Sequence, residues 1–135
     1  MESVNNKLKR AAQCGDINLC ECAKDEGATN FDEMFMQAVE FDHIDLCFIA
    51  KEWGAKNFNS ALALFAERGN KELCQLMKDW GATNFNEMLW KAAKSGDEDL
   101  CQLAKYWGAN DFNKILICAS EYGNKNLCQL AYIFV

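Results

Sequence analysis

The fold is decided by the stretch Phe85–Ala109, which reads FNEMLWKAAKSGDEDLCQLAKYWGA. The pair Leu100-Cys101 within it recurs along the chain with a constant step of 27 residues. Its copies are Leu19-Cys20, Leu46-Cys47, Leu73-Cys74 and Leu127-Cys128. A fixed period of this length is the signature of a repeat architecture. Five copies account for all 135 residues. We therefore predict one domain over 1–135, with repeats at about 4–30, 31–57, 58–84, 85–111 and 112–135.

Each repeat is predicted to hold two short helices. In the fourth repeat the first helix covers about 86–95, with Leu89, Ala92 and Ala93 spaced to lie on one face. The second helix covers about 98–107, and a glycine follows each helix, where a left-handed residue ends it at no steric cost. Helices of about ten residues are marginal alone, so they must bury their apolar stripes against neighbouring pairs. The predicted fold class is all-α, an αα-solenoid of helix-turn-helix repeats.

The first helices carry two candidate N-terminal caps. Asn84 with Glu87, and Asn30 with Glu33, have the spacing of a capping box. Asn86 and its equivalents in the other repeats fit the cap position as well, and the sequence does not separate the two.

The fourth repeat resembles an ankyrin repeat. Ala92-Ala93-Lys94-Ser95-Gly96, followed by Leu100, Leu103 and Gly108-Ala109, is in register with that family. Two features depart from it: the Thr-Pro-Leu-His opening is absent, and the period is 27 rather than about 33 residues. The six missing residues are those of the protruding β-hairpin loop. The resemblance implies five ankyrin-like repeats that lack these loops.

The run Lys105-Tyr106-Trp107-Gly108-Ala109, with Phe112 after it, is also similar to the shortened ankyrin-like arrays of large DNA viruses. Proteins of that kind bind other proteins of the host. The resemblance implies a viral protein that binds a host factor in the host cell cytoplasm.

Composition argues against several classes of function. The net charge is −6, whereas proteins that grip nucleic acids need clustered lysine and arginine. No apolar run approaches the roughly 20 residues of a membrane span, so we expect no membrane partner. The sequence shows no Gly-rich phosphate loop, paired carboxylates or nucleophile–base pair, so we expect no enzymatic activity and no cofactor.

The cysteines and the single histidine are interpreted as structural. Five of the eight cysteines share one phase of the repeat and should pack at the flank of the core, too far apart for disulfides. Free thiols indicate a reducing compartment, and we expect a cytoplasmic protein. Cys14, Cys20 and Cys22 lack a fourth ligand, so no metal site is predicted. His43 is expected in a turn, which should differ from the others because Asp42 replaces a glycine.

The aromatic residues divide into two groups. Trp53, Trp80 and Trp107 share one phase on the leucine stripe and are expected to pack between repeats. Trp90 lies about 100° from the buried stripe of its helix, at a phase that varies between repeats.

Some positions of the first helices hold residues that differ between repeats, and these are the candidate partner-binding surface. Positions that hold the same kind of residue in every repeat are the ones that stacking requires. Apolar anchors within a polar rim are typical of interfaces, so we expect another protein to bind around Met36, Trp90 and Ile117. An ordinary solvated face explains these residues equally well. The candidate residues are Glu33, Met36, Gln37, Glu40, Ala63, Glu67, Glu87, Trp90, Lys91, Lys94, Lys114, Ile117 and Glu121.

The two ends of the array differ from its middle. The first repeat has Lys7, Lys9 and Arg10 where later repeats are apolar, as in a polar end cap. The last repeat ends with an apolar run, which favours association of copies into a homo-oligomer. Its residues are Tyr132, Ile133, Phe134 and Val135. The sequence therefore predicts a non-enzymatic protein-interaction module, with a self-assembling structural component as the alternative.

Overall fold

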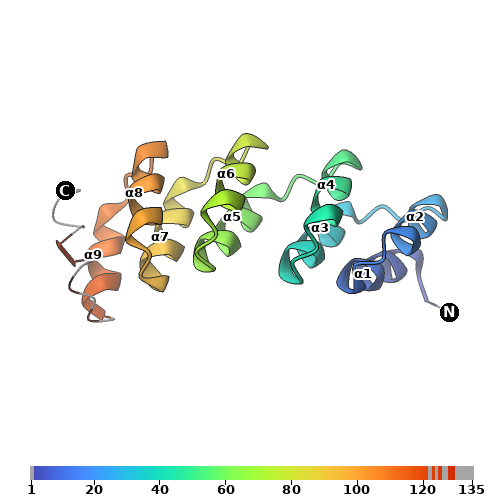
Figure 1. Cartoon of the computed structure of the whole chain (residues 1–135), viewed down its shortest axis with the longest axis horizontal. Coiled ribbons are helices and arrows are strands. Elements are labelled where there is room, and N and C mark those ends of the chain that lie inside the picture. Colours follow the sequence, from blue (N-terminus) through green and yellow to red (C-terminus); the bar gives the residue numbers. More distant parts are fainter. Residues whose placement is uncertain (1, 122, 124, 126–127, 130–135) are drawn as a thin grey trace. The chain divides into compact units, whose positions relative to one another are not determined.

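The computed structural model describes residues 2–121, 123, 125 and 128–129, and these residues form nine α-helices and no strand (Figure 1). The helices are α1 (Val4–Cys14), α2 (Ile17–Asp25), α3 (Phe31–Glu40), α4 (Ile44–Glu52), α5 (Phe58–Glu67), α6 (Lys71–Asp79), α7 (Phe85–Ser95), α8 (Glu98–Trp107) and α9 (Phe112–Glu121). The all-α prediction is confirmed. Within the described part of the chain, no helix is long and apolar enough to cross a membrane.

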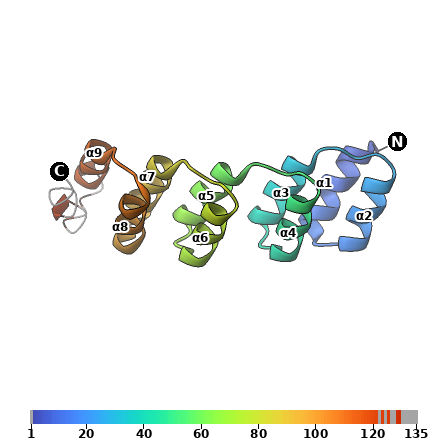
Figure 2. The same cartoon turned by 90° about the horizontal axis from the view of Figure 1, so that it is seen from above.

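The chain divides into two compact units, one up to Asn57 and the other from Phe58 onward. This division falls at a predicted repeat boundary. In the first unit, α1 packs on α2, α3 packs on α4, and α1 packs on α3. In the second unit, α5 packs on α6, α7 packs on α8, and the first helices pack in the order α5, α7, α9 (Figures 1 and 2). Each unit is thus built from helix pairs whose first helices contact one another.

The core of each helix pair is built from apolar residues that recur at helical spacing and from the cysteine of the Leu-Cys pair. In α7 and α8 the buried residues are Met88, Leu89, Ala92, Ala93, Leu100, Cys101 and Ala104. Leu103 and Trp107, which we expected on the buried stripe, are only half-buried. The first helices α1, α5 and α7 each pack on both their pair helix and the next first helix, so their buried face is wider than a single stripe. The small side chains at these contacts allow neighbouring helices to approach closely.

The second helices are capped by an acidic or amide side chain at their start. Asp16, Asn70 and Asp97 each accept a hydrogen bond from the backbone N–H three residues later, at 3.0 Å. A side-chain oxygen in this position satisfies a donor that the helix leaves without a partner. In α4 this position is occupied by His43, whose side chain makes no such bond.

Asp42 keeps the turn conformation that glycine has in other repeats. Its φ is +62°, and Gly15, Gly69 and Gly96 have φ between +73° and +80°. Our expectation that this turn differs is therefore wrong for the backbone, because aspartate tolerates the left-handed region moderately well.

At the start of α1, α3, α5 and α7, one side chain of the helix binds the loop that follows the repeat. Asn5 Oδ1 accepts from Thr29 N–H at 2.9 Å, and Asp32 Oδ1 accepts from Lys56 N–H at 2.6 Å. In the second unit Asn59 and Asn86 do the same, each accepting two backbone N–H groups at 2.8–3.1 Å. We call Asn5, Asp32, Asn59 and Asn86 the Asx clamp.

Of the two candidate caps of α7, Asn86 belongs to the clamp, so the cap is Asn84. Asn84 Oδ1 accepts from Glu87 N–H at 3.2 Å and is the cap, whereas Asn86 reaches forward to the following loop. The capping box expected at Asn30 is wrong, because the Asn30 side chain makes no cap hydrogen bond and instead donates to the Glu33 carboxylate at 3.2 Å. The asparagine directly before the helix is the cap, whereas the asparagine at the second residue of the helix is the clamp.

Candidate functional site

The structure places all thirteen candidate partner-binding residues on first helices, and none of the thirteen is buried. Four lie on α3 in the first unit, and nine lie on α5, α7 and α9 in the second. Ile117 is the most exposed apolar residue among them, with 58% of its surface accessible. Met36 and Trp90 are half-buried. Because Met36 belongs to one unit and Trp90 and Ile117 to the other, the two parts are described separately.

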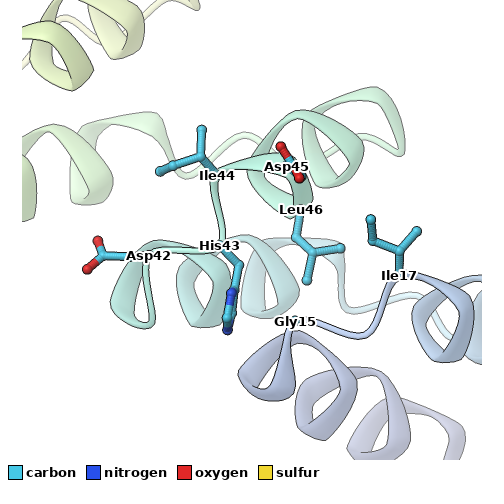
Figure 3. Close-up of a pocket in the computed structure, with 7 residues that line it drawn as sticks. All are labelled: Gly15, Ile17, Asp42, His43, Ile44, Asp45 and Leu46. Atoms are coloured by element: carbon cyan, nitrogen blue, oxygen red, sulfur yellow. The ribbon is translucent and has the colours of Figure 1, made fainter.

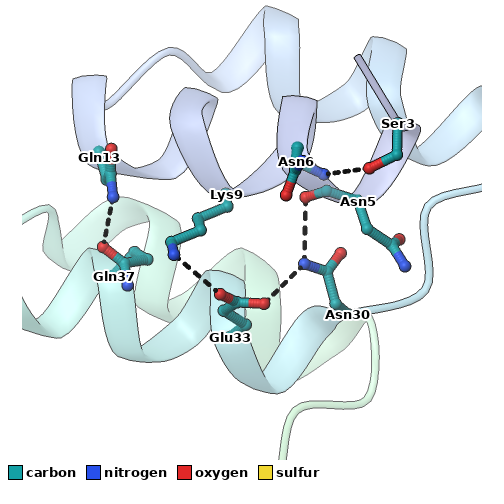
Figure 4. A network of polar contacts seen from close by, with 8 residues as sticks. All are labelled: Ser3, Asn5, Asn6, Lys9, Gln13, Asn30, Glu33 and Gln37. Carbon is teal, nitrogen blue, oxygen red and sulfur yellow. Dashed lines mark hydrogen bonds and ion pairs between the residues drawn. The ribbon is translucent and has the colours of Figure 1, made fainter. Parts of the chain in front are cut away.

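On α3, two of the candidates are held by α1 (Figure 4). The Glu33 carboxylate pairs with Lys9 Nζ at 3.3 Å, and Gln37 Oε1 accepts from Gln13 Nε2 at 2.9 Å. The hydrogen bond from the Asn30 side chain, and then Lys9, lower the pKa of Glu33. These contacts join neighbouring first helices, so Glu33 and Gln37 help to stack the pairs.

The basic residues at the start of the chain are all paired. Lys7 Nζ lies 2.9 Å from the Glu26 carboxylate, and Arg10 lies 3.2 Å from that of Glu2. Lys9 pairs with Glu33 on the next first helix. The three cations of α1 are thus neutralised by nearby carboxylates.

In the second unit, Trp90 and its equivalent Ile117 lie one repeat apart on α7 and α9, which pack together. Lys114 Nζ lies 5.3 Å from the centre of the Trp90 ring, a distance at which the cation is attracted to the ring face. This part of the surface combines an aromatic ring, an exposed aliphatic side chain and positive charge. It has the composition of an interface anchor.

The helix position of Lys91, which we predict to be on the partner-binding surface, is not exposed in every repeat. Cys118, the equivalent of Lys91, is fully buried, and Leu64 at the same phase is half-buried. In α9 the buried residues are Ile115, Cys118 and Ala119, a stripe with helical spacing. The Lys91 phase therefore lies at the edge of the packed face, and Lys91 itself is half-buried.

The tryptophans of the second helices pack at the ends of the helix pairs. Trp53 contacts Phe31 with ring centres 5.6 Å apart, and Trp80 contacts Phe58 at the same separation. Lys24 lies over the Trp53 ring at 5.1 Å. These rings connect the two helices of one repeat and the lysine of the repeat before it. Their surroundings are those of packing residues, and sequence reasoning missed the lysine contacts.

Four of the five cysteines of the repeated phase lie in the core rather than at its flank, and the fifth, Cys128, is half-buried. Cys20, Cys47, Cys74 and Cys101 are at most 2% exposed, and their thiols are free. Burial raises the pKa of Cys20 to about 11 and the pKa of the other three to about 12. A protonated, buried thiol is a poor nucleophile and a poor metal ligand. In the part of the chain that the structure describes, no three histidine, cysteine, aspartate or glutamate residues are grouped so that they could hold a metal ion.

His43 lines a hollow of about 290 Å³ in the first unit (Figure 3). The lining residues are Gly15, Ile17, Asp42, His43, Ile44, Asp45 and Leu46. His43 Nε2 lies 3.0 Å from the Gln13 carbonyl oxygen, and the ring covers Gly15 so closely that a Cβ there would lie 2.8 Å from it. The histidine thus connects the start of α4 to the end of α1, and the hollow has no serine, threonine or cysteine that it could activate as a nucleophile.

The residues expected to mediate self-association, Tyr132, Ile133, Phe134 and Val135, lie outside the described residues.

A scan against protein-family models found no match, and a search of curated proteins found no similar sequence.

Proposed function

We propose that this chain is a non-enzymatic protein-interaction module whose helix pairs form a five-repeat, ankyrin-like α-solenoid. The observation that carries the proposal is that Trp90 and the exposed Ile117 occupy equivalent positions on α7 and α9, two first helices that pack together. A large aliphatic side chain with 58% of its surface accessible gains most from burial against a partner.

The division between constant and variable phases supports the proposal. In the first four repeats the cysteine of each Leu-Cys pair and the alanine of each Gly-Ala pair are buried, and the Asx clamp holds the loop that follows. These phases serve stacking. Trp90, Lys91, Lys94 and Ile117 change from repeat to repeat and contribute little to the core, so they are available for recognition. A surface that is ordered before binding loses less conformational entropy when a partner docks.

The solenoid arrangement is supported by the period of 27 residues and by the repeated packing of first helices within each unit. The resemblance to shortened viral arrays makes a host-cell protein the expected partner, encountered in the cytoplasm. The hollow beside His43 is lined by no serine, threonine or cysteine, and the sequence shows no motif typical of an enzyme, which favours a binding function.

Site-specific photocrosslinking in the cells that make this protein tests the proposal. A photoreactive phenylalanine analogue is placed at Ile117 and, in a matched control, at Tyr106 on α8, which is 86% exposed. We expect a discrete protein adduct from position 117 and none of that mass from position 106. Adducts that are absent at 117, or the same from both positions, contradict the proposal.

A further inference from the structure

Contacts within each unit show which side of a first helix faces the first helix that follows. In the first unit, Lys9 of α1 pairs with Glu33 of α3 at 3.3 Å. In the second unit, the Trp90 ring of α7 lies 5.3 Å from Lys114 Nζ of α9. Lys9 and Trp90 occupy the same position of the repeat, and Ile117 is its copy on α9. Ile117 therefore lies on the side of α9 where a following first helix would pack.

Two polar residues of α9 lie on the same side. Gln13 of α1 donates to Gln37 of α3, and Glu121 is the copy of Gln13 on α9. Asn86 of α7 holds the loop that leads to α9, and Asn113 is its copy. Asn113 and Glu121 are both exposed. They lie four residues before and four residues after Ile117, which is about one helical turn on either side.

This side of α9 is open, although the same positions are covered in the preceding repeats. In α7 they hold Leu89 and Ala93, which are 0% and 2% exposed, and they are buried in each of the first three repeats as well. In α9 they hold Leu116, which is half-buried, and Ser120, which is exposed. Ile117 between them is 58% exposed. We call Asn113, Leu116, Ile117, Ser120 and Glu121 the forward face of α9.

Other exposed apolar side chains do not indicate a missing neighbour. Phe41, Phe48 and Tyr106 are between 46% and 86% exposed. Their equivalents in every described repeat are exposed too, so these positions lie on the surface throughout the array. Only the forward face of α9 combines apolar residues with positions that a helix pair otherwise buries, within the part of the chain that the structure describes.

The first helix α1 does not offer this face an apolar match. Its residues at the positions that contact a preceding first helix are Asn6 and Arg10, and both are polar and exposed. In a head-to-tail stack of copies, Ile117 would lie on Asn6. Glu121 would approach Arg10, whose charge Glu2 already neutralises at 3.2 Å. Polar surface would thus cover the apolar part of the forward face, and this arrangement is disfavoured.

The forward face of α9 is complementary to itself. A two-fold axis that passes close to Ile117 brings the forward faces of two copies together with their helices antiparallel. Leu116 and Ile117 then pack on the same residues of the second copy. Asn113 faces the second copy's Glu121, and its amide donates to that carboxylate on both sides of the axis. The remaining charge of α9, Lys114, lies over the Trp90 ring.

We propose that two copies of this chain form a dimer through antiparallel packing of the forward faces of α9. This inference goes beyond the proposed function, because it requires no other protein. Ile117 belongs to both surfaces, so the dimer and a bound partner exclude each other. One helix of 10 residues offers less than the roughly 1,200 Å² of a stable interface. The dimer is therefore reversible and forms at about 0.1–1 mM chain.

Sedimentation equilibrium of the full chain tests the dimer, at concentrations from about 0.01 to 1 mM and with a reducing agent that keeps the thiols free. Two variants change the forward face: Ile117→Ser and Asn113→Lys. Two matched controls make the same kinds of change at exposed positions of α8: Tyr106→Ser and Gln102→Lys. Thermal melting followed by circular dichroism confirms that each variant is folded.

The two variants should act in opposite directions. Ile117→Ser should raise the dissociation constant of the dimer about tenfold or more, because each copy loses a buried aliphatic side chain. Asn113→Lys places an ammonium group opposite the second copy's Glu121, so it should lower the dissociation constant by about threefold, and added salt should cancel this gain. Tyr106→Ser and Gln102→Lys should leave the dissociation constant unchanged.

Several results would overturn the inference. They are a chain that stays monomeric at about 1 mM, a dimer that Ile117→Ser does not weaken, and a dimer that Asn113→Lys weakens. Association that continues beyond the dimer indicates head-to-tail stacking and also overturns it. None of these results bears on the proposed function, which is tested by the photocrosslink from position 117 to a different protein. An adduct of twice the chain's own mass, without any other, supports the dimer and counts against the proposed function.

Discussion

Replacing Asn59 by alanine tests the Asx clamp. Asn59 Oδ1 accepts from Thr83 N–H at 2.8 Å and from Asn84 N–H at 3.0 Å, so the substitution removes two hydrogen bonds. Each contributes about 1 kcal/mol net, and water reaches the exposed groups afterwards. Alanine recovers about 0.5 kcal/mol through its higher helix propensity. We expect the free energy of unfolding to fall by about 1.5 kcal/mol, measured by urea denaturation followed by circular dichroism.

Asn113→Ala is the matched control. Asn113 occupies the clamp position of α9, is exposed, and has no hydrogen-bond partner for its side chain among the described residues. The same gain in helix propensity applies, so this variant should be unchanged or slightly more stable. Equal losses for the two variants would refute the reasoning, since of these two residues only Asn59 accepts backbone N–H groups within the described part of the chain.

Four further predictions concern the turns and the thiols. Gly15→Ala should destabilise the chain more than the positive φ alone explains, because the new Cβ meets the His43 ring at 2.8 Å; a double-mutant cycle with His43→Ala should recover the excess, and additive effects would argue against the contact. Asp42→Gly should raise the free energy of unfolding by about 0.5–1 kcal/mol because φ is +62°, and a lower midpoint of urea denaturation would contradict this. In the folded chain Cys14 and Cys22 should react with a thiol reagent, whereas the buried cysteines of the repeated phase should react only after unfolding. Their pKa lies above the usual value of 9.0, so the unfolded state releases protons first and stability should fall as the pH rises from about 9 toward 12; a flat profile in this range would contradict the burial.

The helices were predictable because their period is strict. The second helix of the fourth repeat was expected at 98–107 and spans Glu98–Trp107, and the first differs from expectation by one residue at its start. Glycine after each helix and apolar residues three and four apart are local signals. They fix element type and phase without any knowledge of the neighbours.

What the sequence did not reveal depends on contacts between helices. A single helical stripe does not predict that Cys118 is buried, because the stripe does not show that α7 packs against this side of α9. The clamp had a detectable signal, since asparagine or aspartate recurs at an exposed phase where no apolar packing requires it. Its target, a backbone N–H group 24 or 25 residues away, follows only from the packing.

The candidate surface was predicted in part. Ile117 and Trp90 were placed correctly off the core, because their angle from the buried stripe depends only on helical geometry. Glu33 and Gln37 were assigned to recognition by the same reasoning, yet Lys9 and Gln13 on the adjacent helix bind them. Residues that vary between repeats thus include both candidate recognition residues and residues that bind a neighbouring helix. The two kinds are told apart only by the side chains that the neighbouring helix places next to them.

The central claim is that the first helices of the second unit bind the partner protein. Hydrogen–deuterium exchange, measured on the free chain and on its complex with the purified or crosslinked partner, tests this claim most directly. We expect slower exchange in α7 and α9 on binding, with exchange in α6 and α8 unchanged. Protection that falls on α6 and α8, and leaves α7 and α9 as in the free chain, would contradict it.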